Sequence, residues 1–181
     1  MQETGIVRRI DELGRVVIPK EMRKTLRIRE GDPLEIYTNK DELIFKKYSP
    51  ISAINSYAEA VADGIEEVIE KTCVITDNDT VLYVSGKNKE VVGKVISNDL
   101  EKVLKERKSL VLNRREGGNL VPLIKGEEVD FENQIIVPIV SQSGDCYGSV
   151  LVFDNDKEGK FSPSDVRFAK LGASFLSKQF D

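Results

Sequence analysis

Residues 5–29 read GIVRRIDELGRVVIPKEMRKTLRIR, and this stretch decides how the chain begins to fold. Eight Lys and Arg residues interrupt its apolar residues, against four Asp and Glu residues over residues 1–29, which gives a local net charge of +4. The whole chain of 181 residues carries −4, so the remainder carries −8. A basic segment in an acidic chain predicts an anion-binding module, and a long polyanion fits such a module best.

The same stretch predicts two short strands and a helix. Residues 5–10 and 15–18 contain β-branched residues and flank a turn at 11–14, where a glycine is free to adopt a positive φ. Pro19 suits the first position of a helix over residues 20–26, because an N–H has no partner at that position. Cations from the strands and the helix could therefore converge on one surface; the alternative is that they are ordinary solvated charges. The four cations are Arg8, Arg15, Arg23 and Lys24.

Residues 30–48 predict a β-hairpin, which completes a module of two hairpins with a short helix between them. A unit of about 50 residues buries little apolar surface by itself, and this one has neither a disulfide nor a metal site to stabilise it. Two hairpins also leave exposed strand edges. An interleaved dimer, in which strands of two chains share one barrel, would solve both problems.

The pattern V-R-x-I-D-x-L-G-R-V-V-I-P-x-E-x-R-[RK]-x-L, followed by GDPLEIY and ELIFKKY, resembles the AbrB-type DNA-binding domain. The resemblance covers residues 1–50. It implies a swapped-hairpin β-barrel formed by two chains, which binds double-stranded DNA through one basic face. The implied DNA-binding residues are Arg8, Arg15, Arg23 and Lys24, with Arg9 and Lys20 as secondary candidates. The family also accepts arginine at the position of Lys24, where lysine keeps the charge but loses the planar fork.

Composition excludes several classes of function. Hydrophobic residues make up 40% and charged residues 32%, as in a soluble globular protein, and no apolar run approaches the ~18 residues of a membrane span. No secretory signal follows Met1, so we expect a cytoplasmic protein. The chain has no histidine, its two cysteines (Cys73 and Cys146) lack metal-ligand spacing, and no nucleotide-binding or hydrolase motif occurs. We therefore expect no enzyme, cofactor or metal, and two cysteines that act as small buried residues.

Residues 51–70 predict a linking helix. Its apolar residues follow gaps of three and four over about two and a half heptads, at Ile51, Ile54, Ala58, Val61, Ile65 and Val68. This pattern fits a short coiled coil or an amphipathic helix packed on the next domain, and one helix could do both in an oligomer.

Residues 71–181 predict an α+β domain with an antiparallel sheet. The expected strands are 73–77, 81–86, 110–112, 120–124, 134–140 and 146–153, and the expected helices are 89–96, 98–107 and a final helix that starts at a capping box in Ser162-Pro163-Ser164-Asp165. The layout resembles a GAF domain. That resemblance implies a sensor or oligomerisation domain, with a small-molecule effector bound between the sheet and residues 89–133 or with no ligand at all.

An AbrB-type head on a GAF-like body resembles regulators of sporulation in spore-forming bacteria. This combination implies a tetrameric activator or repressor that acts on the nucleoid of the forespore. One alternative is an antitoxin-like interaction module, since such heads also occur in antitoxins. Antitoxins usually carry a disordered tail, whereas residues 51–181 have the pattern of a folded domain. Another alternative, a GAF-related sulfoxide reductase, needs reactive cysteines, and both cysteines fall within apolar strands.

Overall fold

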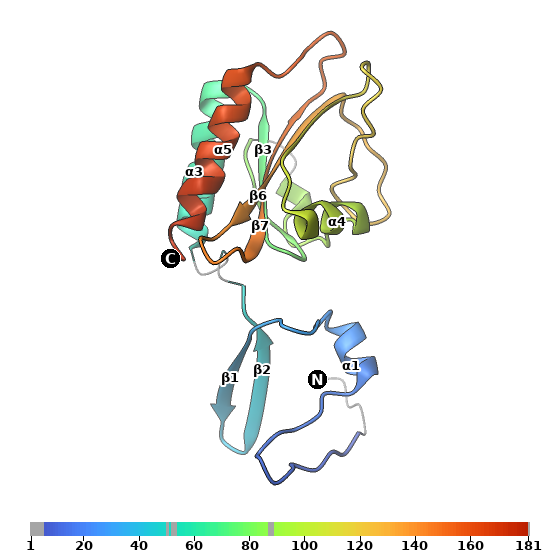
Figure 1. Ribbon diagram of the computed structural model, residues 1–181, viewed down its shortest axis with the longest axis vertical. Coiled ribbons are helices and arrows are strands. Elements are labelled where there is room, and N and C mark those ends of the chain that lie inside the picture. Colours follow the sequence, from blue (N-terminus) through green and yellow to red (C-terminus); the bar gives the residue numbers. More distant parts are fainter. Residues whose placement is uncertain (1–5, 50, 52–53, 87–88, 181) are drawn as a thin grey trace. The chain divides into compact units, whose positions relative to one another are not determined.

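The computed structural model describes residues 6–49, 51, 54–86 and 89–180. The chain divides into two units, Met1–Tyr48 and Ser49–Asp181, which we call the head and the body (Figure 1).

The head contains helix α1 (Lys20–Thr25) and strands β1 (Leu34–Asn39) and β2 (Glu42–Lys47). The strands pair antiparallel, with Leu34 opposite Lys47, so the predicted helix and second hairpin are confirmed. Pro19 is the N-cap residue of α1 and lies one position before the predicted one.

The first hairpin differs from the prediction. The turn at residues 11–14 is confirmed: Gly14 has a φ of +75° and its N–H donates to the Asp11 carbonyl at 3.0 Å. Residues 6–10 and 15–18 are extended but belong to no strand, and Gly5 lies outside the described residues. A strand needs a neighbour to accept and donate its backbone hydrogen bonds. Among the described residues of this single chain, neither segment pairs with a neighbouring strand. The backbone hydrogen bonds between the two segments are those of the turn.

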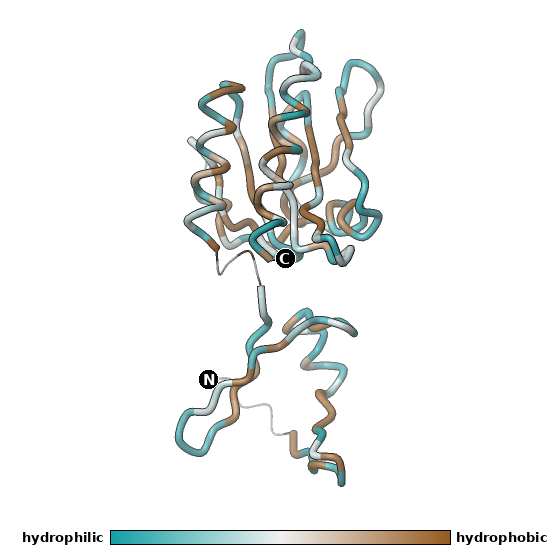
Figure 2. The backbone as a smooth tube through the Cα atoms, turned by 60° about the vertical axis from the view of Figure 1, so that its left-hand side comes forward, coloured by the Kyte–Doolittle hydropathy of each residue, from teal (hydrophilic) through white to brown (hydrophobic). Residues whose placement is uncertain are grey.

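The described residues of the head form no apolar core of their own. Pro19 is the one buried residue among the described residues 6–49. Val7 is 88% exposed and Val17 is 71% exposed, and Figure 2 shows hydrophobic stretches in the head as well as along the strands of the body. The described residues of the head therefore bury little apolar surface among themselves.

The body contains the predicted antiparallel sheet, with strand order β4-β3-β7-β6-β5. Its strands are β3 (Thr72–Thr76), β4 (Val81–Val84), β5 (Leu110–Asn113), β6 (Asn133–Val140) and β7 (Cys146–Asp154). Side chains alternate between the two faces of each strand. Ile75 and Val150 thus belong to one apolar cluster, whereas Val74 and Leu151 belong to the other.

Helices cover both faces of the sheet (Figure 1). Helices α3 (Asn55–Ile69) and α5 (Pro163–Ser177) lie side by side on one face, and α4 (Asn98–Glu106) packs on the other. The predicted capping box is confirmed, since Ser162 Oγ accepts the Asp165 N–H at 3.2 Å and Asp165 Oδ2 accepts the Ser162 N–H at 2.7 Å.

The predicted helix over residues 89–96 is wrong. Only a 3₁₀ turn, η1 (Lys89–Val91), forms, because Gly93 adopts a φ of +80° and its N–H donates to the Val81 carbonyl at 2.8 Å. Ile96 then pairs with Ile124 as an isolated bridge, which is all that remains of the strand predicted at 120–124.

Helix α3 packs on the body as an amphipathic helix. Its buried residues are Ala58, Ala62, Ile65 and Ile69. Val68, which the heptad stripe included, is 59% exposed. Helix α5 approaches closely at Gly172, where a Cβ atom would lie 2.8 Å from the side chains of Val61 and Ile65. Pro50, Ser52 and Ala53, at the predicted start of the linking helix, lie outside the described residues.

Candidate nucleic-acid interface

All six candidate cations are exposed side chains of the head. Arg8 and Arg9 precede the turn at residues 11–14, and Arg15 follows it directly. The other three belong to α1 and are Lys20, Arg23 and Lys24. The structure therefore presents these residues from the extended segments on either side of the turn and from a short helix.

Arg15 is held by Asp11 across the turn. Its guanidinium Nε lies 2.8 Å from Asp11 Oδ2, and Asp11 Oδ1 accepts the backbone N–H groups of Leu13 and Arg15 at 3.0 and 2.8 Å. The Arg15 backbone N–H first, and then its guanidinium, lower the pKa of Asp11 below its ordinary value. The carboxylate is therefore charged at neutral pH and orients Arg15, while the Arg15 side chain stays 69% exposed.

The remaining five candidates have no such partner among the described residues. Within the described part of the chain, no hydrogen bond or ion pair is recorded for the side chains of Arg8, Arg9, Lys20, Arg23 and Lys24. Cationic side chains that have no protein partner are available to an external anion. Arg23 and Lys24 also lie in the last turn of α1, where the helix dipole favours positive charge.

Three other cations of the head are half-buried and have structural contacts. Lys47 Nζ lies 3.0 Å from Asp32 Oδ2 and donates to the Arg27 carbonyl at 3.2 Å. Asp32 Oδ2 also accepts the Arg29 N–H at 2.8 Å. These contacts tie the segment after α1 to strand β2, and they separate Arg27, Arg29 and Lys47 from the exposed set.

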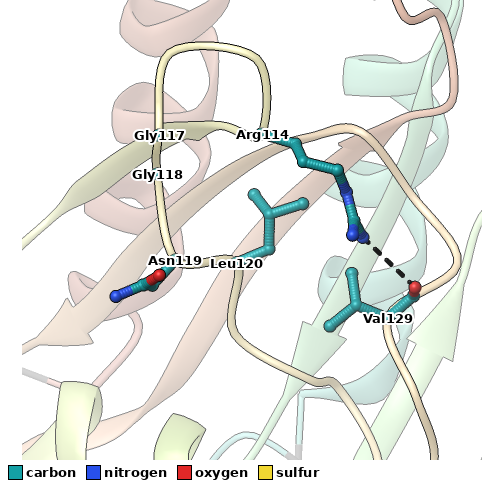
Figure 3. Close-up of a pocket in the computed structure, with 6 residues that line it drawn as sticks. All are labelled: Arg114, Gly117, Gly118, Asn119, Leu120 and Val129. Carbon is teal, nitrogen blue, oxygen red and sulfur yellow. Dashed lines mark hydrogen bonds between the residues drawn. The ribbon is translucent and has the colours of Figure 1, made fainter.

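The body has a cavity of about 370 Å³ beneath the loop at residues 114–120, on the side of the sheet where a ligand pocket was predicted (Figure 3). Arg114 borders it, but its guanidinium donates to the carbonyls of Val129 and Phe131 at 3.3 and 3.1 Å and lies 3.5 Å from Glu132. Arg114 is thus engaged in holding two loop segments together and is a poor candidate for binding an anion.

The described residues contain no group of three or more carboxylates and thiols that could hold a metal ion. No helix among them has both the length and the apolar character needed to cross a membrane. Cys73 is buried, as predicted, whereas Cys146 is only partly buried.

A head with exposed cations, joined to a body with a five-stranded sheet between helices, is the arrangement expected of a regulator with an AbrB-like head and a GAF-like body. Residues 53–181 match the family model described as "Stage V sporulation protein T C-terminal, transcription factor". The chain is 41% identical to stage V sporulation protein T of Bacillus subtilis (strain 168) over all of this chain and 99% of that protein. The chain belongs to the stage V sporulation protein T family.

Each unit also has relatives of its own. The transition state regulatory protein AbrB of Bacillus subtilis is 50% identical over 66 residues, which are 36% of this chain and 69% of that protein. Residues 7–52 match the family model described as "Antidote-toxin recognition MazE, bacterial antitoxin". The GAF domain of an Acinetobacter phosphoenolpyruvate-protein phosphotransferase has 17% sequence identity and a TM-score of 0.57 over 69% of this chain and 80% of that one, which supports the GAF fold.

Proposed function

We propose that this protein regulates sporulation genes by binding double-stranded DNA through the six exposed cations of its head. The observation that carries the proposal is that five of these cations have no partner in the described structure, and that residues 1–29, where they lie, have a net charge of +4 in a chain of −4. Phosphate contacts from Lys and Arg supply affinity and register, and contacts to base edges or DNA shape supply specificity. The chain would act in the cytoplasm, on the nucleoid of the forespore.

We expect DNA binding to weaken steeply with salt. If a dimer presents two copies of the exposed set and half of them contact phosphates, its affinity should fall by roughly 10³-fold between about 50 and 200 mM salt. Gel-shift titrations of the full chain on genomic fragments that it protects in a footprint would measure this slope. A flat salt dependence would remove the electrostatic basis of the proposal.

Two chains would share the core that one head lacks. Val7 and Val17 lie in the extended segments around the turn, and these segments have unpaired backbone in the described chain. Pairing with the same segments of a second chain would satisfy the backbone and cover the apolar side chains. The swapped-hairpin β-barrel would thereby bring two copies of the cations to one DNA-facing surface.

Pairs of chains would join through the bodies to form a tetramer. The outer surfaces of α3 and α5 expose large apolar side chains, and the rings of Tyr57 and Phe175 lie 6.0 Å apart there. The exposed apolar residues on these two helices are Tyr57, Val68, Phe168, Leu171 and Phe175. A second copy of the same surface would cover them with a helical bundle.

Leu171→Glu should reduce a four-chain particle to a two-chain particle, as measured by native mass spectrometry. Leu171 is 66% exposed, so a charge at this position disturbs the proposed contact without disturbing the fold. Lys170→Glu, the neighbouring exposed position, serves as a control and should leave the particle intact. A wild-type mass that corresponds to one chain would refute both proposed interfaces.

The second candidate function is an antitoxin-like interaction module, which the match of residues 7–52 to the antitoxin model favours. An antitoxin would require a toxin-binding segment outside the head. The described residues 54–86 and 89–180 instead belong to the folded body. Specific protection of DNA by the purified full chain discriminates between the two candidates.

A reductase role has less support, because burial raises the pKa of both the Cys73 and the Cys146 thiols and so disfavours the reactive thiolates.

A further inference from the structure

Asp11 is an exposed acidic residue among the six candidate cations of the head. On a surface that binds DNA, a carboxylate repels the backbone phosphates and so weakens the electrostatic attraction that the cations provide. Its charge therefore opposes the affinity of the proposed interface. Its contacts with the turn and with Arg15 indicate instead a role in the geometry of recognition.

The backbone of the turn holds the Asp11 carboxylate in place. Its Oδ1 accepts the N–H groups of Leu13 and Arg15 at 3.0 and 2.8 Å, and the Asp11 N–H donates to the Arg15 carbonyl at 3.0 Å. An ion pair between exposed side chains is usually weak, because both side chains must be ordered to form it. Here the turn already orders the carboxylate, so only the Arg15 side chain remains to be ordered.

The contact with Asp11 determines which part of the Arg15 guanidinium faces outward. The Nε–H donates to Asp11 Oδ2 at 2.8 Å, whereas no hydrogen bond is recorded among the described residues for Nη1 and Nη2. A planar guanidinium that is held at Nε presents these two outer nitrogens as a fork of fixed direction. Such a fork fits a pair of acceptors, either O6 and N7 of a guanine or two oxygens of a phosphate.

We propose that Asp11 is a positioning residue for DNA recognition, which orients the outer fork of Arg15 toward a pair of acceptors that the preferred DNA presents. Because the fork is ordered before DNA binds, DNA with acceptors in line with it is favoured over DNA without them. This role rests on the proposed DNA-binding function and divides the cations by task. Arg15 discriminates between sequences, whereas Arg23 and Lys24, for which no partner is recorded in the described structure, supply affinity that is independent of sequence.

Asp11→Asn tests the positioning role in the full-length protein. The amide oxygen can still accept the N–H groups of residues 13 and 15, which preserves the turn. The amide nitrogen is a donor, so it cannot accept the Arg15 Nε–H and releases the guanidinium. Glu12→Gln is the matched control, because it removes the same charge from the next exposed position of the turn, where no contact of the side chain is recorded among the described residues. Circular dichroism would verify that both variants are folded.

Gel shifts would compare a genomic fragment that the wild type protects in a footprint with an unprotected fragment of the same length. Asp11→Asn should lower the ratio of the two affinities by about tenfold or more, through weaker binding of the protected fragment. Binding of the unprotected fragment should stay equal or become tighter, because a negative charge is lost. Glu12→Gln should leave the ratio unchanged. A general loss of structure in the head would instead weaken binding of both fragments.

The same substitution in an Arg15→Ala background shows whether Asp11 acts through Arg15. There, Asp11→Asn should have no further effect on the ratio. Fragments that contain 7-deazaguanine, which lacks the N7 acceptor, identify the acceptors. A loss of affinity confined to proteins that retain Arg15 assigns the fork to a guanine edge, and the absence of such a loss assigns it to a phosphate.

Three results would overturn the positioning role: an unchanged ratio in Asp11→Asn, an equal fall in Glu12→Gln, or a full further fall in the Arg15→Ala background. Failure of this role is distinguishable from failure of the proposed function. A wild-type protein that discriminates between the fragments, with the same ratio in Asp11→Asn, refutes the role of Asp11 alone. A wild-type protein that binds neither fragment refutes DNA binding itself.

Discussion

Arg15→Ala is expected to weaken DNA binding by about 1–3 kcal/mol for each copy that contacts DNA, while the protein remains folded. The Asp11 carboxylate would still accept the backbone N–H groups of residues 13 and 15, so the turn keeps two of its three bonds to this side chain. The loss in affinity should therefore report the missing guanidinium and not a collapsed head. In a dimer the magnitude of the salt slope should also fall by about two, one for each phosphate contact removed.

Gel shifts at fixed salt, with circular dichroism to verify folding, would measure this effect. Arg115→Ala is the matched control, because it removes an exposed guanidinium from the body, where it pairs with Glu158. It should bind DNA like the wild type. A folded Arg15→Ala protein with wild-type affinity would exclude Arg15 from the interface.

Gly148→Ala should destabilise the body by about 3 kcal/mol or more, the largest stability effect that we expect of a single methyl group. Gly148 has a φ of +155°, and a Cβ atom there would lie 1.9 Å from the Thr76 carbonyl oxygen and 2.8 Å from Asp77 Cα. Both atoms belong to the backbone of the neighbouring chain segment, so no side chain can rotate away to make room. Strands β3 and β7 would have to separate at the end of their ladder, where Thr76 pairs with Ser149.

Gly126→Ala isolates the contribution of backbone strain. Gly126 also has a positive φ, +81°, but a Cβ atom there would meet nothing within 4 Å. Its substitution should cost only about 1–2 kcal/mol. Thermal unfolding of the two variants, followed by circular dichroism, should show a much larger decrease in Tm for Gly148→Ala. Equal decreases would mean that the close approach to β3 does not determine the stability at this position.

Features that depend on a few adjacent residues could be predicted from the sequence. The capping box at Ser162, the cap at Ser97 and the turn at Gly14 each use local hydrogen bonds between residues at most four apart. The exposed cations could be predicted for the same reason, since their spacing places them on the turn and on α1. The ion pair between Asp11 and Arg15 was missed, although its signal is present: a carboxylate four residues before an arginine, across a glycine turn.

Features that depend on distant segments could not be predicted. Residues 89–96 have a helical pattern, but Val81 accepts the Gly93 N–H and Val95 accepts the Lys125 N–H, so tertiary hydrogen bonds replace the helix. A cavity of about 310 Å³ in the body combines residues from four segments between Glu70 and Asn155. No local pattern shows that Phe131 and Phe153 meet, because their contact depends on how the loop after β5 returns to β7.

The lack of a buried core among the described residues of a single head bears on when the protein would act in the cell. If two chains share one core as proposed, the head would gain its interior only on meeting another copy, and the regulator would respond to its own concentration with a cooperative threshold. Newly made chains at low copy number would carry an open head that proteases can cleave, and they would leave promoters untouched. Once synthesis outpaces turnover, pairing would protect the module and create the binding surface in the same step, so gene control would switch on abruptly during development.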